Sequence, residues 1–339
     1  MNVYISNNIY DEKIINFIRN DNHSEIYHHP AWLQAVSEAT DSKYNYLLVE
    51  ENNSLNGLIP FAVKNHIINS LPFTTHCKPL LPKQLNLKSL LSKINELLPD
   101  VHGFSLKFRE DDSAEFDFRK TEYLNHIIYL KENIEEFYNS LGRRSIRRFI
   151  RKSYENGLIL RFGKTEEDLK IFYALECKLR KNIGLPPAPF KFFHSLWEYL
   201  SKHNLILLPI VEFNSIPNAS SIILIFKNRL YFEYTAIDKK YINLYPNHFL
   251  HWEIIKLAHK EYGVRIVDLG RTCKQQQGLI YFKENWNARG IPLVEFSDQP
   301  SNNLKSRAIF NSFKKINKHL PLWMLKLEGH VLFNNFEKH

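Results

Sequence analysis

The sequence predicts an α/β protein of two domains, in which each domain is a mixed, mostly antiparallel sheet flanked by helices. The chain has 339 residues, more than a single hydrophobic core usually serves. Short apolar, β-rich runs alternate with helical segments along most of its length. In the second half three strand-like runs follow one another directly, which a regular β-α-β repeat would not produce.

The first 130 residues mix helices and strands. A helix is expected over 27–39, where Pro30 lies in the first turn and its missing N–H costs least. Two apolar runs with a polar stretch between them, over 46–63, predict a β-hairpin. Further along we expect a helix over 88–98 and strands over 104–108 and 124–130.

Residues 132–155 predict one long, Arg-rich helix, and Gly157 is the residue type that closes helices in a left-handed conformation. The elements after it run strand, two helices, three strands, helix, strand, short helix, strand. The expected strands are 158–162, 205–213, 219–226, 229–236, 264–269 and 292–296, and the expected helices are 166–182, 190–203, 246–262 and 279–285.

These patterns predict four segments: an N-terminal domain over 1–130, a basic helical connector over 131–157, a C-terminal domain over 158–297 and a helical tail over 298–339. Apolar residues in the tail are interleaved with Lys and His. Two interpretations stay open for it: a helix docked on a domain, or an element that Lys and Trp attract to a membrane surface.

The composition is that of an ordinary globular protein, with 44% hydrophobic and 24% charged residues, which excludes wholesale disorder. No apolar run is long enough for a membrane span, and the N-terminus lacks the pattern of a signal peptide. We therefore expect a cytoplasmic protein, with peripheral contact at the inner membrane face left open. Three distant cysteines fit neither a disulfide framework nor a zinc site, so no metal is expected.

The net charge of +9 favours anionic partners, and part of it is concentrated in residues 143–152. On a helix Arg143, Arg147 and Arg151 would form one row, with a second basic row beside it. Such a face repels itself unless carboxylates or phosphates neutralise it. It is therefore either a solvated face paired within the protein or a contact for the phosphates of a sugar nucleotide, tRNA or lipid.

Several short motifs follow one another along the chain. His29-Pro30-Ala31-Trp32 opens the first helix, Tyr245-Pro246-Asn247 opens a later one, Asp268-Leu269-Gly270-Arg271 ends a strand, and Phe282-Lys283 with Trp286 precedes the last strand. In this order and spacing they resemble the FemAB-related branch of the GNAT acyltransferase superfamily, over about residues 25–297. The resemblance implies two GNAT-like domains, and it makes Trp32, Asn247, Arg271, Phe282 and Trp286 candidate substrate-binding residues.

The resemblance also implies an activity: transfer of an acyl or aminoacyl group to an amine of a cell-envelope acceptor, by direct attack and with no tightly bound cofactor. The acceptor would be an amino sugar, a nucleotide- or lipid-linked glycan, or a peptidoglycan precursor, and the donor acyl-CoA or aminoacyl-tRNA. In the family the lysine of the Phe-Lys pair stabilises the transition state, and its match is Lys283. A fixed ammonium near a developing oxyanion can do this.

Other candidates come from the residues themselves. Asp268 and Arg271 could orient a substrate or simply pair with each other. Tyr234, with its neighbours Glu233 and Asp238, could supply a base for the attacking amine, although Tyr234 would fit a core position equally well. Asn287 replaces a glycine of the family pattern, and because Asn tolerates a left-handed backbone we expect the turn to be kept.

Residues 240–245 occupy the place where GNAT enzymes bind the pyrophosphate of coenzyme A, but they lack the small residues that let bare N–H groups approach it. This disfavours coenzyme A. Two other functions stay open: an acetyl-CoA-dependent N-acetyltransferase of small molecules, and a non-catalytic protein that binds nucleic acid or an anionic membrane.

Overall fold

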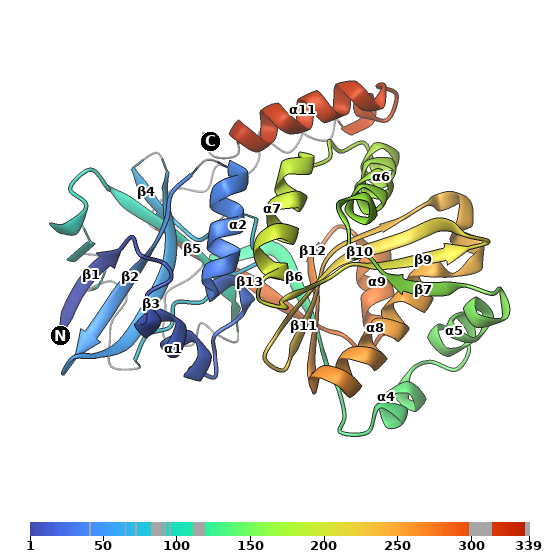
Figure 1. Ribbon diagram of the computed structural model, residues 1–339, viewed down its shortest axis with the longest axis horizontal. Helices are drawn as coiled ribbons and strands as arrows, with labels where there is room; N and C mark the ends of the chain where they lie inside the picture. Colours follow the sequence, from blue (N-terminus) through green and yellow to red (C-terminus); the bar gives the residue numbers. More distant parts are fainter. Residues whose placement is uncertain are drawn as a thin grey trace.

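A computed structural model of the chain describes residues 1–297 and 314–335, apart from 41, 65, 72, 83–89, 91–92, 95 and 111–118. Within these residues one continuous sheet of 13 strands runs through the molecule (Figure 1). Its strands are β1 (Asn2–Ser6), β2 (Tyr44–Glu51), β3 (Ser54–Lys64), β4 (Ile67–Asn69), β5 (Gly103–Arg109), β6 (Arg119–Tyr129), β7 (Ile159–Phe162), β8 (Ile206–Leu207), β9 (Pro209–Phe213), β10 (Ile216–Phe226), β11 (Arg229–Ile237), β12 (Ile266–Cys273) and β13 (Arg289–Ser297).

Helices flank the sheet, as the predicted fold class requires (Figure 1). They are α1 (Glu12–Asn20), the 3-10 helix η1 (Ile26–His28), α2 (Pro30–Thr40), α4 (Ile134–Ser140), α5 (Ile146–Glu155), α6 (Glu166–Ile183), α7 (Phe190–Ser201), the 3-10 helix η3 (Lys239–Leu244), α8 (Pro246–Tyr262), α9 (Gln277–Asn285) and α11 (Leu322–Asn335).

The strand order is β1-β2-β3-β4-β5-β13-β6-β12-β11-β10-β9-β7, with β8 paired to β10. The last strand, β13, pairs with β5 on one side and with β6 on the other. Strand β6 in turn pairs with β12. Strands β6 and β13, which are far apart in the chain, therefore lie side by side and connect β1–β5 with β12, β11, β10, β9 and β7 in one sheet.

The first half contains the predicted hairpin, β2 paired antiparallel to β3. The helix expected over 27–39 begins only at Pro30. Residues before it form η1, and His29 has an extended backbone, because a residue that precedes proline is forced out of the α region. The helix expected over 88–98 includes residues that lie outside the described part of the chain.

The prediction of one helix over 132–155 is wrong. The segment forms two helices, α4 and α5, and Arg143 lies in the link between them. Leu141 ends α4 in an extended conformation and is buried in the core, which turns the chain toward α5. Gly157 has a φ of +74° just after α5, as predicted. The strand expected over 205–213 is split into β8 and β9.

The hydrophobic core under α2 and α7 joins the two halves. Trp32 and Tyr46 of the first half belong to the same cluster as Phe192 and Leu196 of α7. Figure 1 shows α2 and α7 side by side, and the two helices contact each other. A second core lies between the sheet and helices α5 and α8, and a third lies within the first half. The halves thus share buried surface as well as a sheet.

In the C-terminal tail, α11 docks on the molecule, as one of the two interpretations expects. Phe333 stacks on Phe73 with ring centroids 4.4 Å apart and also contacts Phe192. Tail residues 298–313 lie outside the described part of the chain. No helix of the described residues is both long and apolar enough to cross a membrane.

Candidate functional site

Lys283 lies on α9 and directs its ammonium to the end of β12. Its side chain is buried, and Nζ donates hydrogen bonds to the carbonyl oxygens of Gly270 (2.8 Å) and Arg271 (3.3 Å). Burial lowers the pKa of Lys283 to about 8, against the opposing effect of the Asp268 carboxylate. The ammonium of Lys283 is therefore mostly charged at pH 7 and loses its proton as the pH rises through about 8.

Asp268 is buried on β12 and shapes the turn that holds Lys283. Its Oδ2 accepts a hydrogen bond from Asn125 Nδ2 (3.0 Å), and its Oδ1 accepts one from the backbone N–H of Gly270 (2.7 Å). The pairing of β12 with β6 shifts register here, and Gly270 has a φ of +72°. Gly270 thus links the two candidates, because Asp268 holds its N–H and Lys283 holds its carbonyl.

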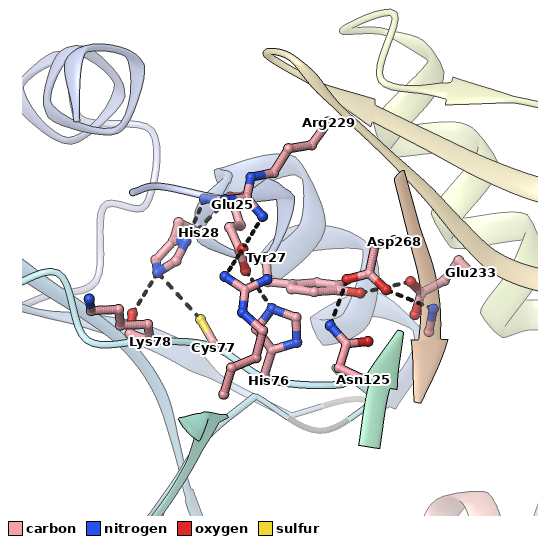
Figure 2. Close-up of polar contacts among 12 residues, drawn as sticks. Glu25, Tyr27, His28, His76, Cys77, Lys78, Asn125, Arg229, Glu233 and Asp268 are labelled. Carbon is pink, nitrogen blue, oxygen red and sulfur yellow. Dashed lines mark hydrogen bonds and ion pairs between the residues drawn. The ribbon is translucent and has the colours of Figure 1, made fainter. Parts of the chain in front are cut away.

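A second carboxylate, Glu233, faces a phenol from the other half of the molecule. Glu233 lies at an irregularity in the pairing of β11 with β10, and Tyr27 of η1 donates a hydrogen bond of 2.8 Å to its Oε2 (Figure 2). Burial raises the pKa of Glu233 to about 7, even though the Tyr27 hydrogen bond lowers it, and the Asp268 charge adds to the rise. A carboxylate with this pKa can exchange a proton near neutral pH.

The same 3-10 segment begins with a buried ionic cluster around Glu25. Its carboxylate contacts His76 Nε2 (2.7 Å), Arg109 (2.8 Å) and Arg229 (3.1 Å), as Figure 2 shows for the labelled partners. Burial alone would raise the pKa of Glu25, but its contacts with His76, Arg109 and Arg229 hold it well below its usual value. Arg229 is the first residue of β11, so its ion pair with Glu25 connects the start of that strand to the first half of the molecule. The hydrogen bond from Tyr27 to Glu233 connects the same strand four residues later.

The sequence analysis placed Glu233 beside Tyr234 as a possible base, and it did not identify Tyr27 or Glu25 as functional residues. It also missed His126, a buried residue of β6. Burial and the nearby Lys283 charge lower the pKa of His126 to about 4, so it is neutral at pH 7. The only signals in the chain were single polar residues beside apolar ones, a pattern that many unrelated positions share.

Buried polar atoms with no hydrogen-bond partner in the described structure occur on the elements around Lys283. They include both ring nitrogens of His126, Oγ1 of Thr272 and Nε1 of Trp286. Buried polar atoms of folded proteins usually have partners, so such groups are where waters or polar ligand atoms bind. No cluster of metal-ligating side chains occurs among the described residues.

Phe282 and Trp286, the motif residues on either side of Lys283, pack against the histidines of α8. Phe282 contacts the rings of His248 and His251 of α8 edge to face, each with ring centroids 5.6 Å apart. Trp286 is fully buried and lies 5.7 Å from the ring of His251. Asn247, at the start of α8, has a buried Oδ1 without a partner among the described residues. Asn287 has a φ of +58°, which confirms the expected left-handed turn.

Tyr234 and Trp32 lie away from Lys283, in and against the core under α2 and α7. Tyr234 packs between Phe192 and Phe193, with centroid distances of 5.8 and 5.2 Å, and burial raises its pKa further above its ordinary value. Trp32 is fully buried, with its ring 5.1 Å from that of Tyr27. Both residues therefore belong to the core under α2 and α7 rather than to the surroundings of Lys283.

The basic residues are on the outer surface. Arg143 is exposed in the link before α5, so the predicted row of three on one helix does not form. Arg147 is half-buried and donates to Asn139 Oδ1 (3.1 Å), and exposed Arg151 pairs with Glu155 (3.3 Å). Arg271 is also exposed, and its guanidinium lies over the ring of Tyr123 at 5.3 Å rather than against Asp268.

The loop before α8 is filled and bonded to itself. The N–H groups of Lys240 and Tyr241 are bonded to Asp238, and that of Tyr245 is bonded to Ile242. The ring of Tyr245 stacks on Phe149 of α5 with centroids 4.8 Å apart. A pyrophosphate needs free N–H groups that point outward. The loop does not form an open cradle of this kind, as its sequence predicts.

Comparison with known proteins adds independent findings. Residues 140–283 match the model of the acetyltransferase (GNAT) domain family. No curated protein matches the chain. The solved structure of FemX has a TM-score of 0.69 at 13% identity, over 93% of this chain and 100% of that one.

Two further solved structures have the same fold at lower similarity. L-PGS from Bacillus licheniformis has a TM-score of 0.54 at 13% identity, over 90% of this chain and 96% of that one. A tandem GNAT protein from the clavulanic acid biosynthesis pathway has a TM-score of 0.53 at 8% identity, over 89% of this chain and 100% of that one. Residues 140–283 thus match a GNAT acetyltransferase domain, and the chain shares its fold with FemX and with the tandem GNAT protein.

Proposed function

We propose that the protein transfers an acyl or aminoacyl group to the amine of a cell-envelope acceptor, with Glu233 as the general base. The observation that carries the proposal is the junction where Glu233, Tyr27 and the Asp268–Gly270–Lys283 turn meet at the GNAT domain. FemX and L-PGS, whose folds are similar, support an envelope acceptor as the first to test.

Glu233 is suited to the proton transfer that this reaction needs. An ammonium has to lose a proton before its nitrogen can attack, and a base whose pKa lies near 7 accepts that proton at neutral pH. The nitrogen then forms a bond to the acyl carbon, and the bond from that carbon to the donor oxygen or sulfur breaks. The proton held by Glu233 passes to the leaving group, and the nitrogen loses its second proton to the freed carboxylate and from there to water. Because the amine attacks the acyl carbon directly, no covalent enzyme intermediate is needed.

Lys283 is suited to stabilise the oxyanion that forms on the acyl oxygen. Its ammonium is held by two carbonyl groups in a buried position, where a charge acts more strongly than in water. The unpartnered His126 and Thr272 offer further polar contacts for the substrates. Arg271, exposed at the end of the same turn, can bind an anionic part of the acceptor.

The donor that fits best is an aminoacyl-tRNA. The self-bonded loop before α8 disfavours coenzyme A, whereas Arg143, Arg144, Arg148 and Arg151 are exposed on one side of the GNAT domain. Of these four, only Arg151 has a carboxylate partner among the described residues. Exposed guanidinium groups in this number bind phosphates and make binding sensitive to salt.

The donor can be tested by calorimetric titration with acetyl-CoA, charged tRNA and uncharged tRNA at near-physiological salt. We expect charged tRNA to bind, and binding to weaken with salt and in the variant Arg144→Gln/Arg148→Gln/Arg151→Gln. Lys260→Gln and Lys202→Gln, which change exposed lysines elsewhere, serve as controls. Micromolar binding of acetyl-CoA without tRNA binding would replace this donor by acyl-CoA.

The transfer itself is measured with labelled aminoacyl-tRNA or acetyl-CoA and a nucleotide-linked peptidoglycan precursor or amino sugar as the acceptor. We expect Glu233→Gln to slow transfer by roughly 10²–10⁴-fold while donor binding stays unchanged. Full transfer by the Glu233→Gln variant would exclude Glu233 as the base. Salt-sensitive binding of tRNA with no transfer to any amine would favour the non-catalytic alternative.

A further inference from the structure

Helix α11 presents apolar side chains on two sides. On the inner side Leu325 and Phe333 are buried against the molecule. Gly329 lies so close to the loop before α7 that a Cβ atom there would fall 2.0 Å from the carbonyl oxygen of Pro187. This close approach fixes which side of the helix faces the protein, and therefore which side faces outward.

The outward side carries a row of large apolar residues. Trp323, Leu327 and Val331, spaced by four, are 63%, 58% and 55% exposed, and Met324 lies beside them. The outer side of a surface helix is normally polar, so a contiguous apolar row indicates an interaction surface. Figure 1 shows α11 along one edge of the molecule, past the ends of α2, α7 and α6.

The charges around this row are almost all positive. Lys314, Lys315 and Lys318 precede the helix, whereas the ammonium of Lys326 lies 5.2 Å from the ring centre of Tyr173 on α6. The single carboxylate among residues 314–335, Glu328, accepts two hydrogen bonds from Asn317 Nδ2, at 2.9 and 3.0 Å. An apolar row that contains Trp and is bordered by lysines complements the boundary between acyl chains and anionic headgroups.

We propose that α11 lies in the surface of an anionic membrane, with Trp323, Leu327 and Val331 inserted at the boundary of the acyl chains and Lys314, Lys315 and Lys318 against the headgroups. This contact does not depend on the acyl-transfer proposal. It would hold the protein beside a lipid-linked acceptor if there is one, and it would equally hold a protein whose acceptor is in solution.

The test uses the full-length protein and vesicles of phosphatidylcholine with or without phosphatidylglycerol. We expect the protein to float with the phosphatidylglycerol vesicles only, and its tryptophan emission to shift to the blue. Trp323→Phe should remove most of that shift, because Trp32, Trp252 and Trp286 are already buried and Trp197 is half-buried against the core under α2 and α7. The variant Trp323→Ser/Leu327→Ser/Val331→Ser should bind at least about tenfold more weakly.

The matched control is Ile159→Ser/Ile216→Ser, which removes two exposed apolar side chains, 65% and 49% exposed, from strands β7 and β10. It should bind vesicles like the wild type, and thermal melting should show all variants folded. Lys314→Gln/Lys315→Gln/Lys318→Gln should weaken binding and reduce its dependence on salt. The proposal is wrong if the wild type does not float, if the triple Ser variant floats equally well, or if that variant instead turns a dimer into a monomer.

Discussion

The hydroxyl of Tyr27 donates a hydrogen bond of 2.8 Å to the carboxylate of Glu233, across 206 positions of the chain and from one half of the molecule to the other. Two residues before Tyr27, Glu25 contacts Arg229 at the start of the strand that carries Glu233. One turn of 3-10 helix therefore contacts that strand at two points. The proposed base has its environment set by the half of the molecule that is not the matched GNAT domain.

The transfer rate should follow the protonation of Glu233. Only the ionised carboxylate accepts a proton, so kcat/KM should fall about tenfold per pH unit below pH 7. The measurement is a pH–rate profile of the wild type. A rising limb near pH 4, where an ordinary Glu titrates, would contradict a raised pKa of Glu233.

Tyr27→Phe should move the rising limb of the pH–rate profile, which we assign to Glu233, to higher pH. The Tyr27 hydrogen bond stabilises the ionised carboxylate, so its removal raises the pKa of Glu233. The shift can be followed without substrate, by NMR titration of the ¹³C-labelled carboxyl group, assigned with Glu233→Gln. Tyr262→Phe, at an exposed tyrosine, is the control and should change nothing. A pKa of Glu233 that stays constant or falls in Tyr27→Phe would show that the hydrogen bond does not tune it.

Lys283 should give the falling limb of the same profile. Its pKa is about 8, so the ammonium loses its charge above that pH and stabilisation of the oxyanion weakens. Lys283→Arg stays charged over this range and should flatten the limb, at a lower maximal rate, because a guanidinium does not reproduce the geometry. Persistence of the falling limb at pH 8 in Lys283→Arg would assign it to another group.

Glu25→Gln should destabilise the fold by about 3–5 kcal/mol at pH 7, because it removes a buried carboxylate that contacts His76, Arg109 and Arg229. The pKa of Glu25 is lowered in the folded state, so its contribution is complete above the unfolded value of 4.5 and is lost as the pH falls through the lower, folded value. Denaturant unfolding at several pH values measures this. Glu261→Gln, at an exposed residue, should cost less than about 0.5 kcal/mol.

Gly270→Ala should impair transfer and lower stability by roughly 1–2 kcal/mol, since a φ of +72° is unfavourable for alanine. The added Cβ meets nothing closer than 3.7 Å, so the effect is one of backbone strain. Relaxation of the turn would move the N–H bound by Asp268 and the carbonyl bound by Lys283 together. Gly278→Ala, where a Cβ has open space, should leave both stability and transfer intact.

The sequence by itself determined what depends on near neighbours in the chain. Alternation and helical spacing predicted the hairpin of β2 and β3 and most helices and strands of the second half. Gly157 and Asn287 adopt the left-handed conformations that their residue types favour. The order of elements and the spaced motifs indicated the GNAT fold, which the family match and the solved structures bear out.

The tertiary structure decided what depends on distant contacts. The burial of Leu141 divides the predicted basic helix and leaves Arg143 outside it. Strand β13 joins the two parts of the sheet, because it pairs with β5 along one edge and with β6 along the other. The pKa of Glu233 is raised only where β11, η1 and β12 enclose it. No local pattern records such an enclosure, since burial and charge pairing arise from residues that meet only when the whole chain has folded.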